Sequence, residues 1–291
     1  MEPSEPSNFD TPQNGELHYP FDGPIEPVKK NWWLFSILLL GTIYTTFSSG
    51  GPYFSISLLL ILGAHEFGHY WASRRNGVQS TLPYFIPAPP QFIAGTFGAF
   101  IQIKQRIPNR RVLMEIGAAG PIAGFVVAVP MLLIGLSLST VTPATGLGGV
   151  NFGSSLILNL CSQLVLGVDP SSPLININLH PIAFAGWIGM LVTALNLMPV
   201  GQLDGGHIIY AIFPDKHRTI GKIFFALLFP LGYFWQGWLF WALMIALMGF
   251  KTAPLIHDNE ILEPIHKVMG GVSMVIFVLT FIPVPFSVIL N

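Results

Sequence analysis

The sequence predicts an all-α polytopic membrane protein with about six to seven transmembrane helices and a short membrane-associated β-hairpin. Of its 291 residues, 52% are hydrophobic and 9% are charged, whereas soluble domains carry about 25% charged residues. Its mean hydropathy is +0.61, and several apolar runs approach the roughly 20 residues that cross a bilayer as a helix. These runs are too continuous for the alternating strands of an outer-membrane barrel.

The first 30 residues differ from the rest of the chain. Residues 1–30 are polar, acidic and rich in proline, which predicts a disordered cytoplasmic tail. They lack the basic segment and short apolar core that mark a signal peptide. We expect residues 31–291 to form a single transmembrane domain, with its core at residues 53–210 and C-terminal helices at residues 220–290.

Each predicted helix follows an apolar run. The run from Ile220 to Phe250 contains Pro230 and several glycines, so we expect two short helices with a turn near Gly232 to Gly237. One long kinked helix is the alternative. The third helix contains IGAAGPIAGF, whose GxxxG-like spacing lets helix backbones approach closely. The other predicted helices are Trp32–Phe47, Tyr53–Ser73, Val112–Leu138, Pro181–Met198 and Val268–Ile282.

The arginines and lysines predict the topology. With a cytoplasmic amino terminus and seven spanning helices, all 13 of them fall on the cytoplasmic side, as the positive-inside rule favours. A six-helix count would place Lys251 outside. The loop Ser139–His180 contains no arginine or lysine and is therefore predicted outside. Its apolar patch, SLILNLCSQLVLG, suits the membrane surface.

A short hairpin is predicted between the second and third helices. The stretch after Ser80 is apolar, but four prolines prevent it from forming a spanning helix. Residues Gly98–Gln105 alternate apolar and polar side chains, which favours a strand. We expect the hairpin to dip into the cytoplasmic face, because non-helical backbone is tolerated there only where protein or water surrounds it.

The stretch HEFGH, residues 65–69, ends the apolar run of the second helix. His65 and His69 are four residues apart, so they lie on one helix face and can bind one ion. Glu66 can then act as general base without occupying a coordination position. The alternative is two water-facing histidines beside a solvated glutamate, although ionisable residues in membrane segments are rare and usually functional.

A hydrolytic zinc site needs three protein ligands and one open position. Asp204 is the other ionisable residue that clearly terminates an apolar helix. The predicted topology puts it on the same side of the membrane as His65 and His69. Neighbouring glycines and a proline are expected to loosen the backbone, so that the carboxylate can be aimed at the ion. The alternative is an ordinary turn aspartate, because Asp-Gly is a common turn pair.

HEFGH together with NLMPVGQLDG, residues 196–205, resembles the motif pair of the site-2 protease family of intramembrane zinc metalloproteases. That family combines HExxH with a later NxxPxxxxDG-type motif. The resemblance covers roughly Leu58 to Tyr210 and fits the compact multi-helix branch without a PDZ domain. It implies that one Zn²⁺ binds to His65, His69 and Asp204. It also implies that Glu66 is catalytic and that Asn196 lies beside the scissile bond.

The resemblance implies hydrolysis of a peptide bond within or near the transmembrane segment of a membrane-anchored substrate. Glu66 would take a proton from water and deliver it to the leaving nitrogen. Asn196 would donate a hydrogen bond to the oxyanion or substrate backbone, or instead join two helices. The implied substrate is a single-span protein, such as an anchored transcriptional regulator. The active site would lie toward the cytoplasmic side of the bilayer, and the net charge of −1 gives no argument for nucleic acid.

Two other classes of function are considered. A metal or proton transporter also places histidine and acidic residues at helix breaks, but it does not require a glutamate directly after the first histidine. A catalytically inactive scaffold is the other alternative, against which the complete ligand set argues. Outside the motifs, Glu115 and His180 are interpreted as helix-terminus residues. His207 is interpreted as a turn histidine, with a supporting role near the metal as the alternative.

Overall fold

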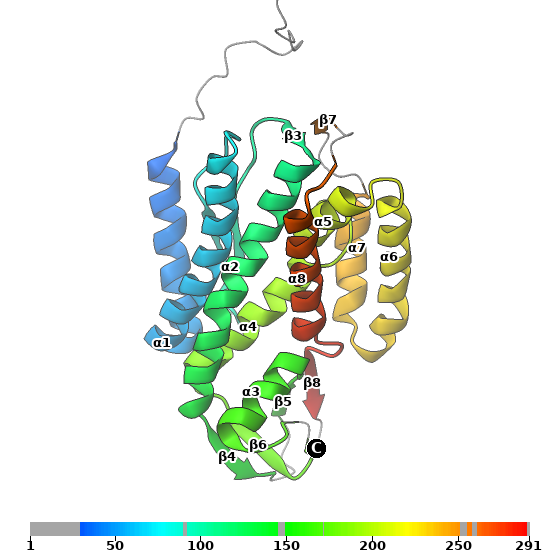
Figure 1. The fold of residues 1–291 in the computed structure, drawn as a ribbon. Helices are drawn as coiled ribbons and strands as arrows, with labels where there is room; N and C mark the ends of the chain where they lie inside the picture. The colour runs from blue at the N-terminus through cyan, green and yellow to red at the C-terminus, as the bar shows by residue number, and fades with distance from the viewer. Residues whose placement is uncertain are drawn as a thin grey trace, which may run out of the picture.

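The computed structural model describes residues 30–89, 92–144, 149–170, 172–250, 255–257 and 261–289. This part of the chain is mostly helical, as predicted, with short strands between the helices (Figure 1). The helices are α1 (Trp32–Arg75), α2 (Arg110–Ser137), α3 (Leu156–Leu166), α4 (Pro181–Asn196), α5 (Asp204–Ile212), α6 (His217–Phe234), α7 (Gly237–Met248) and α8 (Pro264–Thr280). The strands are β1 (Tyr84–Pro87), β2 (Thr96–Phe100), β3 (Ile107–Asn109), β4 (Thr140–Pro143), β5 (Gly149–Phe152), β6 (Ile175–Asn178), β7 (Leu255–His257) and β8 (Phe286–Ile289). The predicted disordered tail lies outside the described residues, except for Lys30.

Helix α1 consists of two predicted helices joined by a sharp turn. Gly51 has φ 76° and ψ −175°, a conformation that favours glycine, and Pro52 follows it. The two arms run side by side in opposite directions (Figure 1), and the hydroxyl oxygens of Thr46 and Ser55 lie 2.6 Å apart across the turn. The predicted break between the first two helices is therefore confirmed. The second arm carries HEFGH near its end.

Helix α2 lies at the centre of the bundle, where it packs against α1, α4, α5 and α8. One cluster of buried side chains, including Leu58, Leu132 and Trp187, joins α1, α2 and α4. A second cluster, including Met114 and Ile208, joins α2 to α5 and α8. Helix α4 runs obliquely across the bundle and leads the chain to α5 (Figure 1). The two helices that carry His65, His69 and Asp204, α1 and α5, therefore both pack against α2.

The helix ends that carry arginine and lysine lie at one end of the molecule. The starts of α2, α6 and α8 lie at the top of Figure 1, and the turn of α1 lies at the opposite end with β4 and β6. By length and hydropathy, α1 and α2 could cross a membrane, and α3, α4, α7 and α8 are shorter apolar helices. The count of six to seven spans stays a prediction.

The segment predicted as an outer loop, residues 139–180, contains a helix that was not predicted. Helix α3 covers most of the apolar patch, and it begins after Ser155, whose side chain accepts a hydrogen bond from the Leu158 amide. It ends at Gly167, whose φ is 67°. One face is buried against α2 and α8, whereas Leu160 and Leu164 are exposed. An apolar run of this length forms a helix here because neighbouring helices pack on it.

Strands β1 and β2 pair antiparallel between α1 and α2, with Phe85 opposite Ala99. The strand predicted at Gly98–Gln105 is shifted, since β2 ends at Phe100. Beyond β2 the chain still lies beside residues 79–81: Ile103 bridges to Ser80, and the Gln102 carbonyl accepts a 3.0 Å hydrogen bond from Thr81. The pairing of β1 with β2 also has a register irregularity between Ile86 and Pro87, which alternation of side chains does not reveal.

The C-terminal helices agree with the predicted break, because α6 ends at Phe234 and α7 begins at Gly237. The two short helices are therefore correct, and the single long helix is wrong. They share a small buried cluster that includes Leu228, Trp238 and Ala242. After α8, strand β8 pairs antiparallel with β5 and connects the chain end to the segment around α3.

Candidate metal centre

Three side chains from two distant parts of the sequence, HEFGH and the start of α5, converge at the end of α1. The Nε2 atoms of His65 and His69 lie 3.1 Å apart. The Oδ2 atom of Asp204 lies 3.3 Å from the first nitrogen and 3.2 Å from the second. Both histidines are buried, and the Asp204 side chain is 17% exposed. The structure therefore brings together the three residues that the motifs single out.

This spacing fits a tetrahedral zinc ion. Zinc binds histidine nitrogen and carboxylate oxygen at about 2.0–2.2 Å. Ligand atoms at the corners of such a tetrahedron are separated by about 3.3 Å. The three observed separations, 3.1, 3.2 and 3.3 Å, match this edge length. Two imidazoles and one carboxylate are also a typical donor set for a catalytic zinc site, which keeps its fourth position open.

The orientation of His69 is fixed by a backbone carbonyl of α2. Its Nδ1 atom lies 2.7 Å from the Ile116 carbonyl oxygen. A carbonyl oxygen only accepts, so Nδ1 donates the proton and the lone pair of Nε2 faces Asp204 and His65. Such a second partner commonly orients a metal-binding histidine. The sequence could not indicate Ile116, because the contact uses its main chain.

Asp204 is positioned by a tight turn between α4 and α5. It is the first residue of α5, and Asn196 is the last residue of α4. Gly205 and Gly206 lie inside α5 against main-chain carbonyls: a Cβ on Gly205 would collide with the Leu197 carbonyl, and one on Gly206 with that of Gly201. The expectation that these glycines loosen the backbone is therefore wrong. They allow close packing, which holds the carboxylate in place.

Glycines of α2 make room for the metal-binding side chains. A Cβ on Gly120 would collide with the His69 ring, and one on Gly124 would lie 3.1 Å from the His65 Cβ. On α1, a Cβ on Gly68 would collide with the Ala119 carbonyl. The close approach predicted from the GxxxG-like spacing is thus found directly behind the site. Larger side chains on this face of α2 would displace the histidines.

Glu66 is buried beside the ligands and pairs with the backbone amide of Ile101, just beyond β2. Its carboxylate is therefore held next to the segment that follows the β-hairpin. This contact links the glutamate of HEFGH to the part of the chain in which a strand was predicted. An alternating pattern at Gly98–Gln105 indicated a strand but not its position over the site.

Asn196 reaches the site from the end of α4. Its amide nitrogen lies 3.4 Å from Nε2 of His65, on the side where the ligand atoms converge. The donor therefore points toward the reaction centre. The alternative interhelical role is compatible with the same contact, because His65 and Asn196 belong to different helices.

These residues line a cavity of about 230 Å³. Besides the motif residues, its wall includes Gln202, His207 and four residues at and beyond the end of β2: Ala99, Phe100, Ile101 and Ile103. His207 lies one turn after Asp204, and its buried Nδ1 atom has no hydrogen-bond partner among the residues that the structure describes. His207 lies within α5, so its interpretation as a turn histidine is wrong. Its place in the cavity wall is compatible with the supporting role that was the alternative. Gln202 was missed, because a single glutamine in a turn carries no distinctive signal.

Two predicted helix-terminus residues have defined partners. Nδ1 of His180 accepts a hydrogen bond from the amide of Ile182, which confirms its capping role for α4. The Glu115 carboxylate accepts hydrogen bonds from Asn76 at 2.8 Å and Arg111 at 3.2 Å, and it lies 3.1 Å from His266 of α8. The interpretation of Glu115 as a helix-terminus residue is wrong, because Asn109 caps α2 and no acidic residue lies in its first turn. Glu115 instead connects α1, α2 and α8.

The chain matches the family model of peptidase family M50 over residues 53–233. The chain belongs to peptidase family M50. The predicted resemblance to the site-2 protease family is therefore confirmed. The matched region contains all the motif residues, from His65 to Asp204, and ends within α6. As a member of the M50 family, the chain is a membrane protein, in agreement with its apolar helices.

Several plant proteins resemble this M50 chain. It is 32% identical over 262 residues to the probable zinc metalloprotease EGY2, chloroplastic, of Oryza sativa subsp. indica, covering 86% of this chain and 46% of the relative. It is 33% identical over 239 residues to the probable zinc metalloprotease EGY1, chloroplastic, of Arabidopsis thaliana, covering 78% and 42%. The chain thus spans about half the length of these curated relatives. No solved structure matches it significantly.

Proposed function

We propose that the chain is an intramembrane zinc metalloprotease that hydrolyses a peptide bond within or near the transmembrane segment of its substrate. The main support for the proposal is the spacing of three ligand atoms, which fits a tetrahedral zinc ion, beside the buried Glu66. The names of the plant relatives support zinc and proteolysis. His65, His69 and Asp204 would hold one zinc ion.

The catalytic roles follow from the positions of the side chains. Bound zinc would supply a Lewis acid that polarises the peptide carbonyl and acidifies water. Glu66 takes a proton from the attacking water as the new C–O bond forms, and it delivers this proton to the leaving nitrogen as the C–N bond breaks. The Asn196 amide donates a hydrogen bond to the negative carbonyl oxygen. Burial of the site keeps bulk water away from these charges.

We infer that the substrate is held by strand addition beside the β-hairpin. Neighbouring residues of an antiparallel strand direct their backbone groups to opposite sides. Gln102 and Lys104 both bond to residues 79–81, so the N–H and C=O of Ile103 point away from that pairing. An unwound substrate segment could bond to these groups while its scissile carbonyl enters the cavity. A helix must unwind in this way before its peptide bonds can be cleaved.

The substrate we propose is a single-span membrane protein, such as an anchored transcriptional regulator. We also propose seven spans, a cytoplasmic amino terminus and a single transmembrane protease domain over residues 31–291. The hairpin would lie at the cytoplasmic membrane face. These statements rest on the charge distribution of the sequence and on the family resemblance.

The direct test is Glu66→Gln. We expect this variant to bind zinc as the wild type does and to lose cleavage of a panel of single-span proteins, because glutamine cannot accept the proton. Zinc is measured by metal analysis of the purified chain, and cleavage by gel electrophoresis. Phe67→Leu, on the exposed side of the same helix, is the matched control and should keep both properties.

Full proteolysis by Glu66→Gln would contradict the proposal. So would a zinc-loaded wild type that cleaves no member of the panel. A wild type that instead moves zinc or protons across a vesicle membrane, with Glu66→Gln unchanged, would support a transporter.

A further inference from the structure

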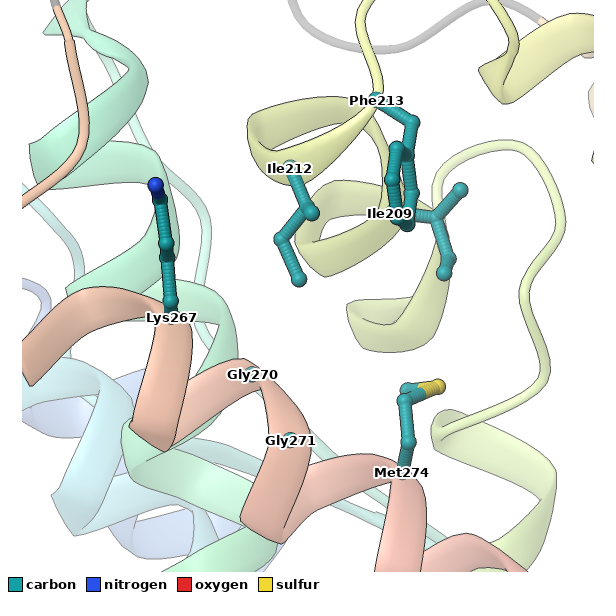
Figure 2. A pocket seen from close by; sticks show the side chains of 7 residues that line it. All are labelled: Ile209, Ile212, Phe213, Lys267, Gly270, Gly271 and Met274. Atoms are coloured by element: carbon teal, nitrogen blue, oxygen red, sulfur yellow. The ribbon is translucent and has the colours of Figure 1, made fainter. Parts of the chain in front are cut away.

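A second cavity, of about 530 Å³, lies between α5 and α8 (Figure 2). Its α5 wall is formed by Ile209, Ile212 and Phe213. This wall contains no charged side chain, and Phe213 is 48% exposed. None of these residues lines the candidate metal centre. The groove therefore presents an apolar surface that proteolysis, as proposed above, does not use.

The α8 wall is hollow because it carries two glycines. A Cβ on Gly270 would lie 2.6 Å from Cδ1 of Ile212, so Gly270 lets the two helices approach. A Cβ on Gly271 would meet no other atom within 4 Å, so Gly271 leaves open space. Met274 closes this wall one turn further along (Figure 2). Its flexible thioether suits an irregular apolar ligand.

Lys267 supplies the one charged group of the groove's lining. It is an exposed residue one turn into α8, at the end of the bundle where the arginines and lysines lie (Figure 1). Glu263 precedes it by one turn, but its carboxylate lies 3.5 Å from Arg111. Within the described residues, no acidic side chain pairs with Lys267. The exposed ammonium can pair with an anion at the edge of the groove that it lines.

We propose that this groove binds one bilayer lipid with an anionic headgroup. The lipid phosphate would pair with Lys267, and an acyl chain would lie across Gly271 toward Met274. Met274 follows Lys267 by seven positions on α8, which corresponds to a rise of about 10 Å along the helix. An apolar groove with one cation at its membrane-surface end is complementary to such a lipid, and basic pockets between helices bind lipid headgroups in this way.

The lipid would support the helix that carries a metal ligand. Asp204 begins α5, and Ile209 and Ile212 of the groove lie on its following turns. A lipid in the groove would fill the space beside α5 and hinder its movement away from α8. The inference concerns a binding site and does not depend on the proposed proteolysis.

The test is native mass spectrometry of the full chain, purified from bilayers of phosphatidylcholine and phosphatidylglycerol in equal amounts. We expect the wild type to retain about one phosphatidylglycerol in preference to phosphatidylcholine. Lys267→Gln should reduce that preference about fivefold, since one basic residue at a membrane surface contributes about 1 kcal/mol toward an anionic lipid. An unchanged preference in Lys267→Gln would overturn the proposal.

A second variant tests the groove itself. Gly271→Leu would fill the groove without a collision at Cβ, so it should reduce retention of both lipids. Val275→Leu, at an exposed α8 position outside the groove's lining, is the matched control and should retain lipid as the wild type does. Thermal unfolding by circular dichroism checks that both variants fold. Equal lipid retention by folded Gly271→Leu and Val275→Leu would also overturn the proposal.

Discussion

At the scale of single residues, the site depends on glycines, which have no side chain, as much as on the metal ligands. His69 receives its orientation from the Ile116 carbonyl and its space from Gly120. Both belong to α2, which contributes no ligand to the site. The positions of the zinc ligands are therefore set by the close contact of α1 and α2, and this contact tolerates no added methyl group at Gly120.

Gly120→Ala should weaken zinc binding about 10–100-fold, the usual cost of disturbing a residue that supports a ligand. Alanine favours helix more than glycine does, so a loss would reflect displacement of His69 and not a weaker α2. Gly41→Ala, also within a helix but with its nearest neighbouring atom at an ordinary contact distance of 3.5 Å, is the matched control. Zinc competition with a chelator measures both. Equal affinities for the two variants would show that Gly120 does not set the ligand position.

The ligands themselves were predictable from the sequence, because HExxH fixes the spacing of two histidines on a helix and Asp204 interrupts an apolar run. The contacts that support these ligands were not predictable from the sequence. The Ile116 carbonyl carries no side-chain signal, and Gln202 and His207 follow from how the turn before α5 folds. Gly205 and Gly206 were correctly noticed, but their role in close packing requires knowledge of what lies against them.

At the scale of elements, Glu115 connects three helices at one end of the bundle. It binds Asn76 at the end of α1, Arg111 on α2 and His266 on α8. His266 is buried and Asn76 is half-buried, so loss of the carboxylate would leave their polar atoms without this partner, although Asn76 also donates to the Ala72 carbonyl. The contact holds α8 against the helices that form the site.

Glu115→Ala should therefore lower the free energy of unfolding by about 1–3 kcal/mol, the usual cost of buried polar groups left without a partner. Glu263→Ala removes only the exposed contact with Arg111 and should cost about 1 kcal/mol or less. Denaturation in detergent followed by circular dichroism compares them. Equal destabilisation would mean that the Glu115 contacts do not hold α8.

The backbone groups of Ile103, beyond β2, allow a test of substrate binding by strand addition. Ile103→Pro removes an amide that points away from residues 79–81, so cleavage should fall at least about tenfold while zinc content stays unchanged. Ile103→Val keeps the amide and is the control. Gln102 is less suitable, because its amide donates to Thr81 Oγ1 at 2.9 Å and proline there would break that contact. Unimpaired cleavage by Ile103→Pro would exclude this mode of binding.

At the scale of the whole molecule, the arginines and lysines are distributed unevenly between the two ends of the bundle. The helix ends with arginine and lysine share one end of the bundle, and the strands around α3 share the other (Figure 1). The sequence predicted this polarity because charge placement follows the membrane. It did not predict α3, because a short apolar run can be a helix, a strand or a loop until its packing partners are known.

The polarity gives a labelling test. The single cysteine, Cys161, is buried, so introduced cysteines can be observed separately. An impermeant maleimide is added to sealed spheroplasts that contain the protein. Asn176→Cys on β6 should react with it. Arg218→Cys on α6 should react only after the membrane is opened. Both positions are exposed in the structure. The reverse pattern would invert the proposed topology, and labelling of both in sealed spheroplasts would contradict opposite placement.

The pairing of β5 with β8 has a consequence for the order of assembly during synthesis. All three metal ligands and the turn before α5 are made before α6 emerges, whereas α8 and β8 follow α6 and α7 in the chain. The nascent chain can therefore bring the ligands together before β8 closes against β5 and before His266 reaches Glu115. Strand β8 would then close the bundle after the ligands that precede it in the chain are in place.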